Sequence, residues 1–234
     1  MGKRTRTFGP LKAGYGSYKK RRTNAPAGLA KYNVARGLQR RRQVLTGSES
    51  NYVDTANANY ANDTTGSIVL LNTVAQGTSV NQRIGKKFYM KSIQMRGIMQ
   101  NEATAISNNI ASLLVYDKRP TGALPVITDI LNTIDSASFN NDANSGRFRI
   151  IRRWDEVLNG GLTLATHPIL DSTIKNMDQF VPLNLPVVNK AAGTGAIGDI
   201  EEGALYFVTV GNNVAAGTVA ASSNVGFRLR FKDM

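Results

Sequence analysis

The chain has 234 residues and a formal net charge of +13, with 29 lysines and arginines, 16 acids and no cysteine. The absence of cysteine excludes disulfides, thiolate zinc sites and a cysteine nucleophile, and it fits a reducing compartment. At 41% hydrophobic residues the chain is globular rather than disordered overall. No signal peptide is evident and no stretch approaches the ~20 apolar residues of a membrane span, so no membrane partner is expected.

The excess positive charge lies entirely in the first 42 residues. This segment holds 13 lysines and arginines and no acid, since the first acid is Glu49, and the remainder holds 16 bases and all 16 acids. A tail that repels itself in this way cannot fold without a polyanion. We therefore expect a basic arm over residues 1–45 and a neutral domain over residues 46–234. This division is typical of a protein that holds nucleic acid electrostatically and does not read individual bases.

Within the arm, residues 1–27 are expected to be flexible, with Pro10 and Pro26 as breakers, and residues 28–43 to form a short basic helix that Gly37 weakens. Two clusters of bases suit phosphate binding and nuclear import: Lys19, Lys20, Arg21 and Arg22, then Arg40, Arg41 and Arg42. Tyr15 and Tyr18 precede the first cluster and are candidates for stacking on unpaired bases. A merely solubilising tail is the alternative interpretation.

The neutral domain begins with strand patterns. Two sets alternate over residues 93–99, which predicts a long strand. One set is Ile93, Met95, Gly97 and Met99, and the other is Gln94, Arg96 and Ile98. The apolar run at residues 111–116 is typical of a strand buried on both faces. After Pro125, residues 127–134 are predicted to form the one short helix of the domain.

The second half of the domain continues the pattern. In residues 147–154 the alternation slips by one at Ile150-Ile151, which predicts a β-bulge. Residues 205–210 form another buried run. Near the C-terminus an apolar set alternates with Gly226, Arg228, Arg230 and Lys232, and it comprises Val225, Phe227, Leu229 and Phe231. Many strands, loops rich in Gly and Asn and little helix together predict an all-β sandwich or barrel.

Three features invite an enzymatic interpretation, and each has a simpler explanation. Residues 193–198 match G-x-G-x-x-G, but acids follow where a nucleotide site needs an apolar helix. His167, the only histidine, precedes a proline and has no nucleophile motif nearby, so we interpret it as structural. The adjacent acids Asp155-Glu156 and Glu201-Glu202 would point to opposite faces of a strand. We expect no catalytic residue, no metal and no cofactor.

Four segments, in order along the chain, resemble the coat proteins of geminiviruses and related circular single-stranded DNA viruses. Residues 82–93 (QRIGKKFYMKSI) are similar to the family's RxGKRFxxKSV segment, and residues 114–120 (LVYDKRP) to LVRDRRP. Residues 148–154 (FRIIRRW), with Gly160-Gly161 after them, resemble YQVLRKW…GG. Residues 227–233 (FRLRFKD) resemble the ending IRIYFYD.

The resemblance implies an eight-stranded jelly-roll sandwich, a shell of many copies, and an inward basic arm that binds a single-stranded DNA genome and host nuclear import receptors. It places the protein in the virion and, during assembly, in the host nucleus. Lys86, Lys87, Arg228 and Arg230 become candidate phosphate contacts on the inner surface. The plant-virus members carry Cys and His early in the domain, proposed to bind metal, and this chain lacks them there. A cellular nucleic-acid-binding protein with a basic extension, of ribosomal or chromatin type, is the alternative function.

Overall fold

The structure is a computed structural model that describes residues 51–101, 107–159, 174–190, 193–213 and 221–234. All of these belong to the second of the two units into which the chain divides, Ser48–Met234. The basic arm, its predicted helix, its clusters and tyrosines, and His167 lie outside the described residues, so the expectations about them stay predictions. No helix in the described ranges is long and apolar enough to cross a membrane.

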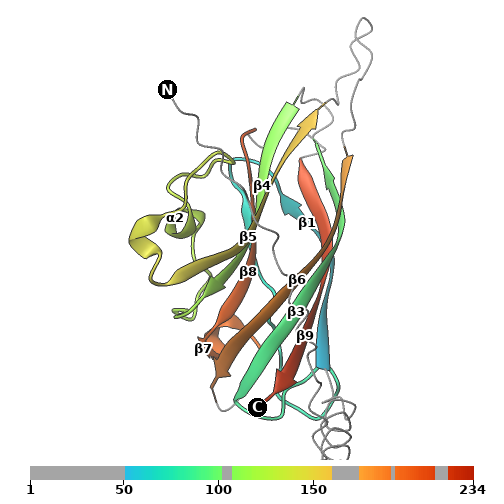
Figure 1. The fold of residues 1–234 in the computed structure, drawn as a ribbon, viewed down its shortest axis with the longest axis vertical. Helices are drawn as coiled ribbons and strands as arrows, with labels where there is room; N and C mark the ends of the chain where they lie inside the picture. The colour runs from blue at the N-terminus through green and yellow to red at the C-terminus, as the bar shows by residue number, and fades with distance from the viewer. Residues whose placement is uncertain (1–50, 102–106, 160–173, 191–192, 214–220) are drawn as a thin grey trace, which may run out of the picture. The chain divides into compact units, whose positions relative to one another are not determined.

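Two antiparallel sheets face each other (Figure 1). In order across the sheet, the five-stranded one contains β1 (Asn51–Ala61), β9 (Ser222–Asp233), β3 (Lys87–Gln100), β6 (Ile174–Asn189) and β7 (Ile200–Glu202). The four-stranded sheet contains, in order, β2 (Ser67–Leu70), β8 (Ala204–Gly211), β4 (Ser107–Asp117) and β5 (Phe148–Asn159).

The pairing of these strands is nested. The first strand, β1, pairs with the last, β9, and β2 pairs with β8; inside them β3 pairs with β6 and β4 with β5. This is the pattern of a jelly roll, in which a folded-over hairpin distributes eight strands between two sheets. The predicted eight-stranded jelly roll is therefore confirmed, and the three-residue β7 is an addition at the edge of the larger sheet.

The hydrophobic core fills the space between the sheets, as the strand periodicity predicts. On β9, Val225, Phe227, Leu229 and Phe231 are all buried, while Arg228 and Lys232 are exposed. The two continuous apolar runs in β4 and β8 are buried along their whole length. Their outer face does not meet water because Ile127, Ile130 and Leu131 of the β4–β5 connection belong to the same core.

The predicted bulge on β5 is confirmed. Leu114 of β4 pairs with Arg152 and the next residue, Val115, pairs with Ile150, so Ile151 is the extra residue. A bulge lets two consecutive apolar residues occur without reversing the faces of the whole strand.

The predicted helix over residues 127–134 is wrong in its length. Helix α2 spans only Ile127–Ile130, and Leu131 is already extended, at φ −113° and ψ 152°. Leu131 forms a bridge with Asn140, and the Asn132 amide donates to the Phe139 carbonyl at 2.9 Å. These long-range partners compete successfully with a weak helix, since isolated helices this short have little stability of their own.

The glycine-rich segment at residues 193–198 has no helix after it. A 3₁₀ turn, Ile197–Asp199, leads directly into β7. Asp199 Oδ2 accepts hydrogen bonds from Thr194 N at 2.7 Å and from Thr194 Oγ1 at 3.0 Å. The Thr194 N–H, which a bound phosphate would need, thus already donates to the Asp199 carboxylate. The segment also lacks the helix N-terminus that holds phosphate in a nucleotide site.

Candidate nucleic-acid interface

The outer face of the five-stranded sheet carries the candidate cations of β9. Because side chains alternate along a strand, burying Phe227 and Leu229 places Arg228 and Arg230 on the opposite face. Arg228 lies between Asp54 of β1 and Gln94 of β3, and Arg230 lies beside Tyr52 of β1. The predicted register of the last strand is therefore confirmed.

Acids from other strands occupy the same face. Arg228 forms a two-pronged ion pair with Asp54, from Nε to Oδ1 and from Nη2 to Oδ2, both at 2.7 Å. Its guanidinium carbon also lies 4.7 Å from the centre of the Tyr52 ring. The hydrogen bonds lower the pKa of Asp54 and raise that of Arg228. Sequence reasoning missed this pairing because Asp54 belongs to a strand far away along the chain.

A second pair lies on the same face, between Arg96 Nε of β3 and Asp178 Oδ1 of β6 at 3.3 Å. Both side chains are mostly exposed, so the interaction is weakened by solvent and salt. A phosphate can compete with a carboxylate for such an arginine, because both are anions that accept paired hydrogen bonds. The two acids neutralise only part of this face, because Arg230, Lys91 and Lys232 lie on it as well.

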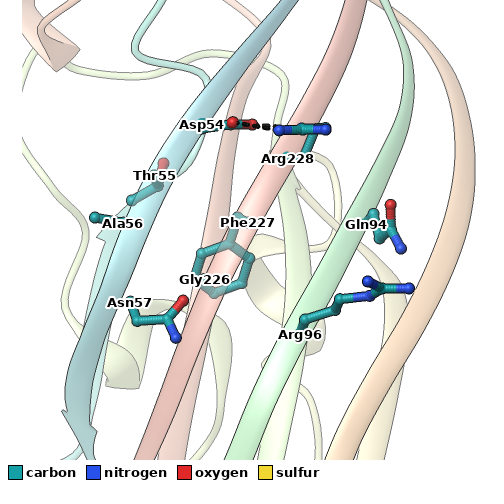
Figure 2. A pocket seen from close by; sticks show the side chains of 9 residues that line it. All are labelled: Asp54, Thr55, Ala56, Asn57, Gln94, Arg96, Gly226, Phe227 and Arg228. Atoms are coloured by element: carbon teal, nitrogen blue, oxygen red, sulfur yellow. Dashed lines mark hydrogen bonds and ion pairs between the residues drawn. The ribbon is translucent and has the colours of Figure 1, made fainter.

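Between the two pairs lies a hollow of about 360 Å³, shown in Figure 2. Gly226 forms part of its floor, and the bulge in β1 brings Asn57 close above this glycine, where a Cβ would collide with the Asn57 amide. The amides of Asn57 and Gln94 and the guanidinium of Arg96 line the opening. The hollow therefore offers hydrogen-bonding groups to a polar ligand, and it has no buried catalytic group.

Lys86 and Lys87 lie at the start of β3, and both are exposed. The Lys86 carbonyl accepts from Asn189 N at 2.8 Å, which fixes the backbone here against β6. No acid occurs in the sequence from residue 64 to residue 101, but the neighbouring strands bring Asp233 of β9 and Glu202 of β7 to this end of the sheet.

Arg83, just before these lysines, is fully buried. Its Nη1 donates to the Gly85 carbonyl at 2.6 Å, while Nε and Nη2 have no hydrogen-bond partner. Burial lowers the pKa of Arg83, and the charges of Asp199 and Asp233 oppose that shift. Asp233 Oδ2 also accepts from Ile84 N at 3.2 Å, so two of the segments that carry the family resemblance meet here. Nothing local in the sequence signals the burial of this cation.

The other acids have structural surroundings. Asp117 is buried and accepts from Arg147 Nε at 3.0 Å and Nη2 at 2.8 Å, and from Arg119 N at 3.0 Å. Burial and the Asp117 charge raise the pKa of the neighbouring Tyr206. Asp155 pairs with Arg153 at 2.8 Å, and Glu201 and Glu202 are exposed. Within the described ranges, no group of three His, Asp or Glu side chains could hold a metal ion.

Comparison with known proteins gives one consistent answer. A model of the "Geminivirus coat protein/nuclear export factor BR1 family" matches residues 3–234. The capsid protein of Miscanthus streak virus (isolate 91) is 25% identical over 176 residues, which cover 68% of this chain and 69% of that protein. The capsid protein of Tomato golden mosaic virus (strain Yellow vein) is 30% identical over 104 residues, 41% of this chain and 42% of the relative.

The capsid protein of Tomato leaf curl virus (strain Australia) is 29% identical over 104 residues, and there the chain spans only 40% of the relative's length. Among solved structures, the human polyomavirus 6 VP1 pentamer aligns over 80% of this chain and 95% of that chain. Its TM-score is 0.32 with 10% identity. We draw nothing from a likeness this loose, and the jelly-roll assignment depends on the nested strand pairing alone.

Proposed function

Because this chain belongs to the geminivirus coat protein/nuclear export factor BR1 family, we propose that it packages single-stranded DNA inside the shell that it builds. Membership gives the chain a structural role in the virion, as one of many copies in a capsid, and not an enzymatic one. The alternative of a cellular ribosomal or chromatin protein loses its support, since the relatives described above are viral capsid proteins.

The observation that carries the packaging proposal is the separation of charge. Thirteen bases in 42 residues are joined to a body whose bases and acids balance. Each nucleotide adds one phosphate, so a shell of about 60 copies would bring roughly 800 positive charges to the packaged strand. The arm supplies affinity without base reading, as a protein that must cover a whole genome requires.

The outer face of the five-stranded sheet is the proposed second contact with DNA. Arg228 and Arg230 present guanidinium groups there, and Lys86 and Lys87 add two exposed lysines where β3 begins. Asp54 and Asp178 neutralise part of this face, so we expect it to position the strand and to add little affinity. The arm remains the main site, with Tyr15 and Tyr18 stacking on unpaired bases.

Removal of residues 1–42 tests the proposal. For single strands, the logarithm of affinity falls with the logarithm of salt concentration at about 0.7 per neutralised phosphate, so 13 bases allow a slope as steep as about −9. The shortened protein should stay folded and lose most of its affinity and most of this slope in a fluorescence-anisotropy titration with an oligonucleotide. An unchanged slope would place the DNA site on the body.

The double change Arg228→Gln and Arg230→Gln is the matched control on the body. Two lost phosphate contacts should lower the slope by no more than about 1.4, while the melting temperature stays close to that of the unaltered protein. If this double change lowered the salt slope more than the arm deletion does, the sheet and not the arm would be the main DNA site.

We further propose that the same arm clusters bind host nuclear import receptors, which would bring the protein to the nucleus for assembly. Short runs of four and three consecutive bases are the chemistry that such receptors recognise. Import and packaging then use the same side chains at different times, since a receptor and DNA would compete for them.

A further inference from the structure

The connection between β4 and β5, residues 118–147, presents a set of apolar side chains to solvent; we call it the 118–147 excursion. Phe139 is 82% exposed, which is unusual for a phenylalanine. Leu124, Val126 and Ile134 are exposed as well. Exposed apolar side chains gathered on one segment indicate an interaction surface, whereas single ones scattered over a protein need no explanation.

The backbone around Phe139 is firmly held. The Phe139 carbonyl accepts from Asn132 N, and Thr133 N donates to Ser138 Oγ, both at 2.9 Å. Arg153 of β5 donates from Nη1 to the Ser138 carbonyl at 2.8 Å, and from Nη2 to that of Ser136. Because the backbone is already ordered, binding needs to order only the ring of Phe139, and a large apolar side chain on a fixed backbone suits an interface anchor.

A complementary hollow lies on another part of the molecule. Where the loop at Ser79–Asn81 meets β1, residues 52–54 and 79–81 line a hollow of about 440 Å³. Val80 and Tyr52 are both substantially exposed, and Tyr52 N donates to the Val80 carbonyl at 3.3 Å, which fixes the two walls. We call this the Tyr52–Val80 hollow. Its size suits an aromatic ring, and Tyr52 and Val80 offer apolar contacts beside the polar residues Asp54, Ser79 and Asn81.

The anchor and the hollow belong to different sheets. The excursion extends from the four-stranded sheet, whereas β1 is the edge strand of the five-stranded sheet, on the other side of the sandwich (Figure 1). A contact that joins two different patches is heterologous, and it closes into rings when repeated with the right rotation. A capsid is built from many copies of one chain, so a second copy is the natural occupant.

Charge favours the same pairing. The excursion holds three acids in its middle, Asp129, Asp135 and Asp142, and three bases at its two ends, Lys118, Arg119 and Arg147, of which Arg147 is paired with Asp117. The hollow lies beside two cations of β9, since Arg228 is paired in register with Asp54 and Arg230 with Tyr52. Asp54, the acid in the hollow, is already bound to Arg228. The acids nearest Phe139 in the chain, Asp135 and Asp142, would thus approach cations whose neighbouring acid is already paired, which favours this orientation between copies.

We propose that Phe139 of one copy inserts into the Tyr52–Val80 hollow of its neighbour and is an anchor of the contact between subunits in the shell. The inference depends on the capsid role and not on the packaging proposal. The contact would join the 118–147 excursion, which extends from the four-stranded sheet of one copy, to the β1 edge of the five-stranded sheet of the next copy.

Cysteine cross-linking tests the contact directly, because the natural chain has no cysteine. Particles assembled from the full-length double variant Phe139→Cys, Val80→Cys are treated with a short bismaleimide and separated on a denaturing gel. A ladder of covalent dimers and higher multimers is expected, and each single variant should give at least tenfold less. Intact particles of the double variant without a ladder would overturn the proposal.

A second pair of variants covers the case in which the cysteines prevent assembly. Phe139→Ser should keep the melting temperature of the natural protein, because the side chain is exposed, yet lower the particle yield at least tenfold in sedimentation velocity. Asn132→Ala, an exposed side chain in the same excursion, should assemble normally. Normal particles from Phe139→Ser would contradict the inference. The arm's DNA affinity should be unaffected, so this failure is distinct from failure of the packaging proposal.

Discussion

Phe227 of β9 is the side chain on which the two sheets depend most directly. It is 3% exposed, and its ring centre lies 4.9 Å from that of Phe207 on β8 and 5.9 Å from that of Tyr60 on β1. Phe207 belongs to the opposite sheet, so this contact joins the two layers. Truncation of a buried phenylalanine to alanine costs about 3–5 kcal/mol, which combines lost burial with the cavity that remains.

The change Phe227→Ala should therefore be visible in thermal unfolding. For a domain of this size each kcal/mol lowers the melting temperature by about 2–4 °C, so the expected fall is roughly 6–20 °C. The measurement is differential scanning fluorimetry of the shortened protein that lacks residues 1–42, so that DNA carried by the arm does not contribute. We also expect full-length Phe227→Ala to yield no particles, because a loosened sandwich cannot hold the contact surfaces of a shell.

Phe180 provides the matched control. It is a phenylalanine of the same sheet, but it lies on the outer face and is 60% exposed. Surface truncations are usually within about 0.5 kcal/mol of neutral, so Phe180→Ala should shift the melting temperature by less than about 2 °C. Equal shifts for the two variants would refute the assignment of faces on which the fold argument depends. A slip of one residue on β9 would exchange those faces.

Three further outcomes are expected. Asp117→Asn should lower the free energy of unfolding by about 3 kcal/mol in a denaturant titration, because it leaves the partly buried Arg147 without its charge partner. Asp155→Asn, at an exposed acid, should lower it by less than about 1 kcal/mol. The hydrogen bond from Arg228 holds the pKa of Asp54 below its ordinary value, so the stabilising contribution of Asp54 is present above that ordinary value and is lost as the pH falls through the lowered pKa; Asp54→Asn should remove this part of the acid unfolding profile. Alanine at residues 19–22 should reduce nuclear accumulation of a fluorescent fusion, and alanine at residues 40–42 should add to the loss; unchanged accumulation in both would restrict these clusters to packaging.

The sequence alone determined the features that depend on local order. The charge division is a matter of counting, and the faces of β9 follow from a period of two with bulky apolar residues at every second position. The bulge at Ile151 was visible for the same reason, since two adjacent apolar residues interrupt an alternation. The buried runs in β4 and β8 were equally legible, because a strand covered on both faces has few positions for polar side chains, and each run holds one, Ser112 and Thr209.

Only the tertiary structure decided which side chains meet. Asp54 and Arg228 are 174 residues apart, and it is the register of β1 on β9 that converts an apparently free cation into half of an ion pair. Arg83 is buried by the chain that folds over it, and the predicted helix ends at Ile130 because residues beyond it find partners across the 118–147 excursion. Pairings of this kind depend on the closure of long loops around a common core. That closure is a property of the whole chain, and no local window of the sequence contains it.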